Sequence, residues 1–392
     1  MFAVLSTARK IWALLVLVAA PAILGACAPV PGGGGAAPNV AKGEAVQVAL
    51  LLPGGSGNAG DDVLARSLQN AAELAIRDLN GVNIDLRVYN TGAGAAAAAQ
   101  TAVRAVDEGA KIILGPVFAE AANAAGVAVA GRGVNVLSFS NNTDIAGGNV
   151  FVLGPTFQNT ANRLVGYSAA QGKRNILIVH DNNAAGNLGK RAIETAARRS
   201  SATIAGAIGY EFSQQGVMQA VPSIVAQARS GGANALFLTA DSAGALPLLS
   251  QLLPEAGLSG TSTQFIGLTR WDLPSATLAL PGVQGGWFAL PDPGLTQQFQ
   301  QRYSAAYGEA PHPIAGLAYD GIAAIGALVR SGRTDALGRA ALTQGSGFAG
   351  VNGVFRLLPD GTNERGLAVA QIRNNQVVVI DAAPRSFGGF GL

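Results

Sequence analysis

The sequence predicts an α/β fold with two similar lobes, each built on a parallel sheet with helices on both faces. Short, nearly continuous apolar runs alternate with longer segments whose apolar residues recur at helical spacing. Such runs are typical of strands buried on both faces, and their alternation with helices indicates βαβ units. The pattern starts near Val46 and restarts after Gly154-Pro155.

Composition limits the function classes. The 392 residues are 49% hydrophobic and 12% charged, which excludes long, highly charged disordered segments. The 26 basic and 23 acidic residues nearly balance, so no electrostatic footprint for a nucleic acid is present. One cysteine excludes an internal disulfide, and two histidines argue against a zinc cluster. We expect no cofactor.

The N-terminus has the features of a targeting segment. Arg9-Lys10 is followed by an apolar run over 11–24, which is too short to span a membrane. The run ends in Leu24-Gly25-Ala26-Cys27, which resembles the lipobox of bacterial lipoproteins. We therefore expect a signal peptide over 1–26 and acylation of Cys27, although a chance cysteine after an ordinary signal peptide is the alternative.

The segment after Cys27 predicts a tethered location. Pro and Gly dominate it, so 27–44 is expected to be a flexible tether for a domain over 45–384, with a loose tail over 385–392. The protein would sit in the periplasm on a lipid anchor. Residue 28 is Ala and not the Asp that marks inner-membrane retention in some bacteria, which favours the outer membrane slightly.

The first half gives its elements in a regular order. The apolar run 46–52 predicts a central strand, and the helix that follows its glycine loop has leucines and alanines at helical spacing up to Asn80-Gly81. Alternation predicts a strand over 84–89, and an alanine-rich segment predicts a helix over 93–108. Strands over 111–114 and 135–139 flank a helix over 120–132.

The same order returns in the second half. Helices are expected over 163–171, 188–199, 217–230, 246–256, 296–307 and 315–329, and strands over 175–179, 203–210, 234–239, 264–268 and 285–289. The end of the chain predicts antiparallel strands over 353–357 and 366–380 around the turn Pro359-Asp360-Gly361.

The sharpest local motif is Gly55-Ser56-Gly57-Asn58-Ala59-Gly60, which matches G-x-G-x-x-G between a strand and a helix. A dinucleotide site also needs an acid after the next strand, where this chain has Tyr89-Asn90. We favour a loop lining a ligand cleft, with Ser56 as a candidate contact and its backbone amides able to accept an anionic group.

Catalytic patterns are missing. The sequence contains no G-x-S-x-G, no S-x-x-K and no phosphate loop ending in G-K-[ST]. His180 beside Asp181 allows a general base, but a structural histidine at a strand end is the commoner case. We therefore expect a protein that is not an enzyme.

Polar residues gather where the predicted strands end. The carboxyl ends of parallel strands meet at one edge of a sheet, so these polar residues predict a cleft for a small polar ligand. The alternative is that they are turn and cap residues. The candidate ligand-binding residues at these ends are Ser138, Ser140, Asn141, Asn142, Asn182, Asp241, Arg270 and Trp271.

Taken together, these segments resemble a type I periplasmic binding protein of the leucine-binding family. The resemblance runs from Val46 to Ile380 and rests on five stretches in order. They are 48–53 (VALLLP), 113–116 (ILGP), 136–138 (VLS), 178–181 (IVHD) with Gly186, and 318–321 (AYDG). It implies two Rossmann-like lobes joined by three hinge crossovers near Gly154, Gly282 and Arg333. Lobe 1 would then comprise 45–153 and 283–333, and lobe 2 would comprise 156–281 and 336–384.

The family implies capture of a small polar, amino-acid-like solute for an ABC permease. Its amino-acid binders hold the ligand carboxylate with two residues. One supplies a hydroxyl, and the corresponding residue here is Glu120; the other is a Thr, which Asn142 matches approximately. Their capping aromatic corresponds to Ala185 here, and Asp241 is the nearest match for the acid that pairs with the ligand ammonium.

A second group of similar fold fits comparably. The chain also resembles the C-terminal domain of the outer-membrane lipoprotein that activates penicillin-binding proteins. The shared features are the lipobox, the opening VALLLP over 48–53, and the Gly115-Pro116 loop followed by an acid. This resemblance implies a peptidoglycan synthase as partner and a role through protein–protein contact.

Overall fold

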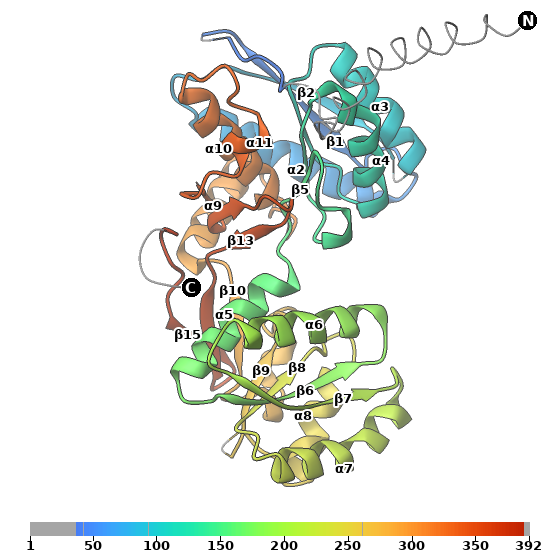
Figure 1. The fold of residues 1–392 in the computed structure, drawn as a ribbon, viewed down its shortest axis with the longest axis vertical. Helices are drawn as coiled ribbons and strands as arrows, with labels where there is room; N and C mark the ends of the chain where they lie inside the picture. Colours follow the sequence, from blue (N-terminus) through green and yellow to red (C-terminus); the bar gives the residue numbers. More distant parts are fainter. Residues whose placement is uncertain (1–36, 42, 93, 261, 388–392) are drawn as a thin grey trace, which may run out of the picture. The chain divides into compact units, whose positions relative to one another are not determined.

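The computed structural model describes residues 37–387 except 42, 93 and 261, and shows two lobes that each contain a large sheet (Figure 1). The expected signal peptide, Cys27 and most of the expected tether lie outside the described residues, as do the last five residues of the expected tail. Val40 belongs to the fold: it is buried, and its N–H donates to the Thr334 carbonyl at 2.9 Å. The expectation that the tether extends to residue 44 is therefore wrong.

Lobe 1 contains a five-stranded parallel sheet in the order β2-β1-β3-β4-β5. Alternate residues of a strand face opposite sides. In β1, Leu50 packs with α2 and α10 (Gly316–Arg330), whereas Leu51 packs with α3 and α4, so both faces are covered. The elements up to the first crossover are β1 (Val46–Leu52), α2 (Ala59–Asp78), β2 (Ile84–Asn90), α3 (Ala95–Asp107), β3 (Ile112–Leu114), α4 (Ala119–Val129), η1 (Ala130–Arg132), β4 (Val136–Ser138), η2 (Thr143–Ile145) and β5 (Val150–Val152).

Lobe 2 contains a seven-stranded sheet in the order β15-β14-β10-β9-β8-β6-β7. Strands β6 to β10 are parallel to one another, β14 is antiparallel to β10, and β15 is antiparallel to β14. In β6, Ile178 packs with α5 and α6, and Leu177 packs with α7 and α8. The first elements are α5 (Phe157–Ala170), β6 (Asn175–Asp181), α6 (Ala184–Arg198), β7 (Thr203–Tyr210), α7 (Gln214–Ser230), β8 (Ala235–Leu238), α8 (Leu246–Glu255), β9 (Gln264–Gly267), η3 (Ser275–Ala279), η4 (Pro281–Val283) and β10 (Trp287–Leu290).

The chain then returns to lobe 1 and ends its regular structure in lobe 2. In lobe 1, Phe299, Ile322 and Phe355 join the core beneath β1. A small antiparallel sheet, β11-β12-β13, packs there too. The elements are α9 (Pro293–Tyr307), α10 (Gly316–Arg330), α11 (Arg339–Leu342), β11 (Phe348–Gly350), β12 (Gly353–Leu357) and β13 (Asn363–Arg365) in lobe 1, then β14 (Ala368–Arg373) and β15 (Gln376–Asp381) in lobe 2.

The positions of the three crossovers are set by this order of elements. The first, between β5 and α5, lies at Gly154 as expected. The second comes after β10, not at Gly282, because β10 pairs with both β9 and β14 inside the lobe 2 sheet. The third lies between β13 and β14 and not near Arg333, because α11 and the small sheet pack on the lobe 1 core. The expected lobe boundaries at 283 and 333 are therefore wrong, since the spacing of elements does not reveal which sheet a strand joins.

The tail also differs from the expectation of a loose segment. The guanidinium of Arg356 lies 4.7 Å from the ring centroid of Phe387, so the described part of the tail is docked. No helix among residues 37–387 as described is long and apolar enough to cross a membrane.

Candidate functional site

Four of the predicted ligand residues are at the end of β4 and in the loop after it, and three of their side chains each accept a hydrogen bond from the backbone N–H two residues further along. Ser138 is fully buried, and its Oγ donates to the Pro116 carbonyl at 3.0 Å and accepts from the Ser140 N–H at 3.1 Å. Ser140 Oγ accepts from the Asn142 N–H, and Asn142 Oδ1 accepts from the Asp144 N–H. Side chains used in this way shape the loop. Ser138, being buried, cannot touch a ligand.

The glycine loop after β1 is held by the first turn of α2. Ser56 Oγ donates to Asp61 Oδ2 at 2.6 Å, and Asp62 Oδ1 accepts from the Gly55 N–H at 2.9 Å. Asn58 caps α2 through the Gly60 N–H. With two acids and a cap at this helix start, the expected acceptance of an anionic group is unfavourable.

Three of the remaining candidates are exposed. Glu120 is exposed in the first turn of α4. Asn182 is exposed and donates to Glu211 Oε1 at 3.0 Å. Asp241 is exposed beyond β8. Their roles as ligand contacts stay predictions.

Trp271 was expected to form an apolar wall, and this is wrong. Its side chain is fully buried in the lobe 2 core, where a Cβ built on Gly267 would lie 2.3 Å from its indole ring. Its neighbour Arg270 forms a bidentate pair with Asp272, with Nε 2.6 Å from Oδ1. The sequence does not distinguish a Trp that is buried under the loop from one that is turned outward.

A buried polar cluster lies at the carboxyl ends of β6, β7 and β8. Asp181 Oδ2 accepts from Thr239 Oγ1 at 3.3 Å, and His180 Nδ1 lies 3.0 Å from the Asp181 carbonyl. His180 is only 6% exposed, which agrees with a structural histidine. Burial and the neighbouring Asp181 raise the pKa of Tyr210, so its hydroxyl keeps its proton.

Two of the predicted residues, Asn141 and Asn142, line a groove of about 720 Å³ that we call the interlobe groove. Lobe 1 contributes the loop and η2, and lobe 2 contributes the first turn of α5 and one face of α6. The volume lies within the range of roughly 300–1,000 Å³ that small-molecule sites occupy. The lining residues are Asn141, Asn142, Thr143, Asp144, Thr156, Phe157, Gln158, Ala184, Ala185, Asn187, Leu188, Arg191, Ala192 and Thr195.

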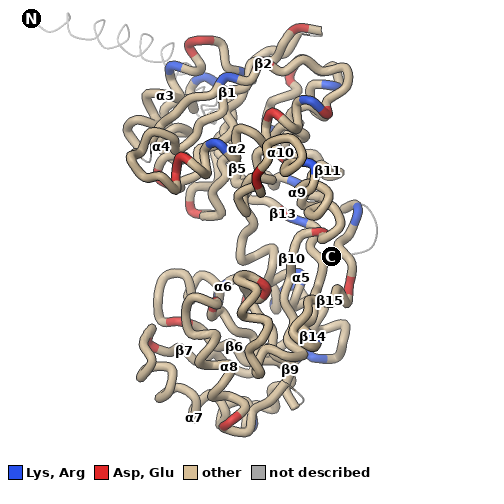
Figure 2. The backbone as a smooth tube through the Cα atoms, turned by 180° about the vertical axis from the view of Figure 1, so that it is seen from behind, with Lys and Arg blue, Asp and Glu red and all other residues tan. Residues whose placement is uncertain are grey.

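The polar face of α6 was not predicted as part of the site. Asn187, Arg191 and Thr195 are four residues apart and share one face of the helix. This polar stripe is visible in the sequence, but an i, i+4 stripe is also the ordinary solvent face of a helix, so only the structure identifies its neighbour. Charged residues are sparse elsewhere and both signs occur in each lobe (Figure 2). No group of three potential metal ligands occurs in the described chain.

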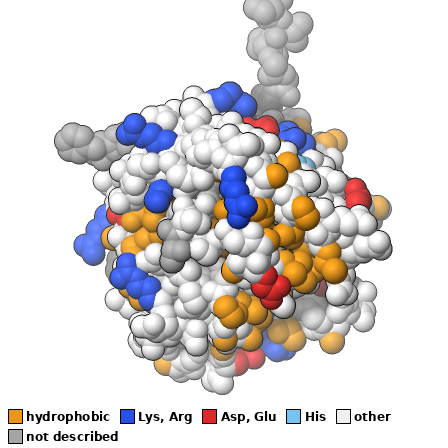
Figure 3. Space-filling view, turned by 90° about the horizontal axis from the view of Figure 1, so that it is seen from below, with side chains coloured by type: hydrophobic (Ala, Val, Ile, Leu, Met, Phe, Trp, Pro, Cys, Tyr) orange, Lys and Arg blue, Asp and Glu red, His pale blue; other side chains and the backbone are white. Residues whose placement is uncertain are grey.

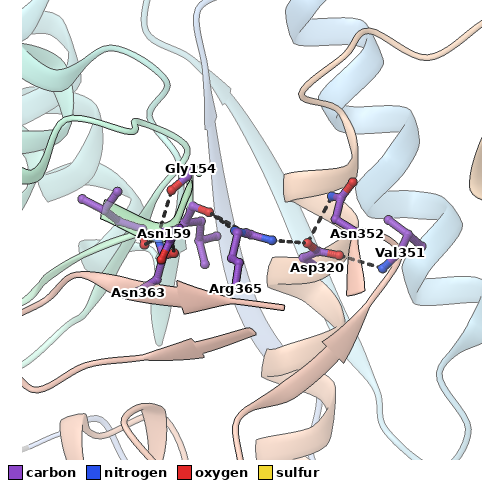
Figure 4. A network of polar contacts seen from close by, with 9 residues as sticks. Gly154, Asn159, Asp320, Val351, Asn352, Asn363 and Arg365 are labelled. Atoms are coloured by element: carbon purple, nitrogen blue, oxygen red, sulfur yellow. Dashed lines mark hydrogen bonds and ion pairs between the residues drawn. The ribbon is translucent and has the colours of Figure 1, made fainter. Parts of the chain in front are cut away.

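A smaller pocket of about 230 Å³ lies beside the crossovers and includes Arg270, Asn352 and Arg365 among its lining. Arg365 belongs to the polar network of Figure 4. Its guanidinium pairs with the buried Asp320 at 3.1 Å and donates to the Leu153 carbonyl at 3.1 Å. Asp320 also accepts from the Val351 N–H and the Asn352 amide. Burial raises the pKa of Asp320, against the opposing effect of Arg365.

The network joins two crossovers that are far apart in the sequence. Asn363 Nδ2 donates to the carbonyls of Val152 and Gly154, and its amide lies 2.8 Å from that of Asn159 (Figure 4). On the lobe 2 side, Arg163 Nε donates to the Leu367 carbonyl at 2.6 Å. Arg365, at the start of the third crossover, thus bonds to the backbone of the first crossover. Arg163, in α5 after the first crossover, bonds to the backbone of the third crossover.

Two lobes of this topology, joined by three crossovers with a groove between them, define a type I periplasmic binding protein fold. The family model of the periplasmic binding proteins matches residues 45–376, and the chain belongs to that family. No curated protein is similar enough in sequence to match this chain.

Solved structures share the fold at low identity. A branched-chain amino acid ABC transporter protein from Rhodospirillum rubrum has a TM-score of 0.73 at 19% identity, covering 86% of this chain and 100% of its own. An ABC transporter substrate-binding protein from Desulfitobacterium hafniense in complex with Leu gives 0.62 at 19%, covering 86% and 100%. A solute-binding protein from R. palustris in complex with benzoate gives 0.56 at 18%, covering 88% and 97%.

Proposed function

We propose that this protein is a lipid-anchored, extracytoplasmic binding protein that captures a small polar, amino-acid-like solute for an ABC permease. The observation that carries the proposal is the interlobe groove, which takes residues from both lobes of a chain in this family. A ligand that contacts both lobes favours the arrangement in which they approach. Leucine and benzoate in proteins of similar fold support small solutes as the class, without naming one.

The network at the crossovers supports hinge closure. Arg163 and Arg365 each form hydrogen bonds to the backbone of a crossover. This leaves few residues between the lobes whose backbone torsions are free to change. Large angular change is then absorbed by few torsions, as in hinge-type closure.

A thermal-shift screen tests solute capture. The full-length protein is heated with amino acids, short peptides, aromatic acids and cell-wall fragments. A ligand at 100 times its dissociation constant adds about 2.7 kcal/mol to the free energy of unfolding, which raises Tm by a few degrees in a chain of this size. Asn142→Ala should reduce the response, since Asn142 lines the groove. Absence of any shift would contradict solute capture.

The anchor has a separate test. We expect the wild-type protein in the membrane fraction through acylated Cys27, with the outer membrane favoured, and Cys27→Ser in the soluble periplasmic fraction. Equal membrane association of the two would contradict the anchor.

A second candidate function is activation of penicillin-binding proteins through contact with a peptidoglycan synthase. It is favoured by large hydrophobic side chains left on the surface of lobe 2: Phe212 is 64% exposed, Met218 52% and Leu273 50%. Figure 3 shows groups of hydrophobic side chains on the face seen from below, with basic and acidic side chains between them. Exposed hydrophobic patches commonly mark interaction surfaces.

The two functions separate in a binding experiment. A solute receptor should show no affinity for purified peptidoglycan synthases. An activator should bind one of them, and Met218→Asp should weaken that binding while Asn142→Ala leaves it unchanged.

A further inference from the structure

The interlobe groove contains one charged side chain of each sign, and the two come from different lobes. Its lining contains one acidic residue, Asp144 in η2 of lobe 1, and one basic residue, Arg191 in α6 of lobe 2. Both residues are exposed. Within the described part of the chain, neither side chain forms an ion pair or a hydrogen bond. The groove therefore presents one unpaired charge of each sign, each from a different lobe.

Between these charges the lining offers unused amide groups. Asn142 uses its Oδ1 on the Asp144 N–H, which leaves its Nδ2 without a partner among the described residues. Gln158 uses its Nε2 on Asn162 and the Ala192 carbonyl, which leaves its Oε1. Asn187 makes no side-chain hydrogen bond to a described residue. Amide donors and acceptors of this kind match the N–H and C=O groups of a peptide backbone.

The size of the groove leaves room for a ligand longer than a single amino acid. A volume of about 720 Å³ is in the upper half of the range for drug-sized ligands, roughly 300–1,000 Å³. The two termini of a single amino acid lie on one carbon atom, whereas the acid and the base here are on opposite lobes. A ligand with an ammonium at one end and a carboxylate at the other can reach one charge on each lobe.

We propose that the interlobe groove binds a short peptide as its zwitterion, with the C-terminal carboxylate at Arg191, the N-terminal ammonium at Asp144 and the backbone amides at Asn142, Gln158 and Asn187. Arg suits a carboxylate because its planar fork donates two parallel hydrogen bonds. A peptide held at both ends bridges the lobes and so favours their closure. This inference rests on the proposed solute capture and specifies its substrate class.

Calorimetry on the full-length protein tests the inference with trialanine and an equimolar library of tripeptides. Each is compared with its N-acetylated form, which lacks the ammonium, and its C-amidated form, which lacks the carboxylate. We expect the free peptides to bind and each capped form to bind at least ~10-fold more weakly, since a lost charged partner costs about 1.4 kcal/mol or more.

Two variants test which residue binds each terminus of the peptide. Arg191→Gln should bind the free and the amidated peptide equally, and Asp144→Asn should bind the free and the acetylated peptide equally. Lys190→Gln is the matched control, because Lys190 is on the same helix but does not line the groove, and it should retain the preference for free termini.

The outcomes separate this inference from the proposed function. If tripeptides do not bind, or bind equally well when capped, while another solute raises Tm, the peptide inference is wrong and solute capture stands. If no solute of any class binds, both are wrong.

Discussion

Asp320 of α10 and Arg365 of β13 form a 3.1 Å ion pair whose side chains are 0% and 5% exposed. The pair is also fully hydrogen-bonded: Val351 and Asn352 donate to the carboxylate, and the guanidinium reaches the Leu153 carbonyl. A buried charge is stable only when it is paired and bonded in this way. The pair therefore makes β13, α10 and the first crossover depend on one another.

We expect Asp320→Asn to lower the free energy of unfolding by about 3–5 kcal/mol, because it leaves the Arg365 charge buried and unpaired. Urea unfolding followed by circular dichroism measures the change. The matched control is Glu309→Gln, which breaks the exposed pair with Arg66 at 3.4 Å. That variant should change stability by less than about 1 kcal/mol. Equal effects of the two substitutions would contradict the structural role of the buried pair.

The reciprocal bonds of Arg163 and Arg365 predict where the hinge loosens. Arg163→Gln removes the donors to the Leu367 carbonyl and to Asp381, so amides around the third crossover should exchange faster. Arg365→Lys should do the same around the first crossover, where the Gly154 N–H donates to the Ser140 carbonyl at 3.0 Å. Hydrogen exchange with mass spectrometry measures both. If exchange changes only in the segment that carries each substitution, the crossovers are not coupled.

Most of the fold was predictable because the longer strands and helices each have a local signal. The run 46–52 is buried at every position, and the second half repeats the pattern. The short elements β5, α11, β11 and β13 were not predicted, and the other errors concern which sheet a segment joins. The strand expected over 285–289 exists as β10, but its partners β9 and β14 are set by long-range pairing. Similarly, only β12 and β13 flank the Pro359-Asp360-Gly361 turn, while β14 and β15 pair elsewhere.

Lowering the pH should reduce the stability of lobe 1 through Asp78, whose side chain links α2 to α9 and α10. Burial raises its pKa, but hydrogen bonds from Arg302 and Tyr319 outweigh this and hold the pKa of Asp78 below its ordinary value. An acid whose pKa is lowered in the folded state contributes stability above its unfolded pKa of about 3.9. That contribution is lost as the pH falls through the lower, folded value.

We therefore expect the difference in unfolding free energy between wild type and Asp78→Asn to shrink when the pH falls from 7 to 3. Because the side chains of Asp78 and Arg302 are 34% and 46% exposed, the difference at pH 7 should be below ~1 kcal/mol. Urea unfolding at both pH values measures it, with Glu309→Gln as the control. A difference that is the same at pH 7 and pH 3 would contradict the role of Asp78.

The candidate site was harder to predict than the fold. Ser138, Ser140 and Asn142 are the residue types that ligands and loops both use, and here they bond within their own loop. Conversely, Arg191 carries no local signal, since an exposed arginine on a helix is ordinary. Its place in the groove depends on the packing of α6 beside the first crossover, which is set by the whole fold.

Trp271 gives the sharpest test of this distinction, because a ligand-contacting and a core tryptophan respond differently to substitution. We expect Trp271→Ala to cost about 3–5 kcal/mol through the cavity it leaves. Gly267→Ala should cost about 1–3 kcal/mol by overpacking, because its Cβ would lie 2.3 Å from the indole. Trp271→Phe should keep the full Tm response to whichever solute shifts the wild type. A solute response abolished by Trp271→Phe, with stability within about 0.5 kcal/mol of wild type, would return Trp271 to the binding site and contradict its place in the core.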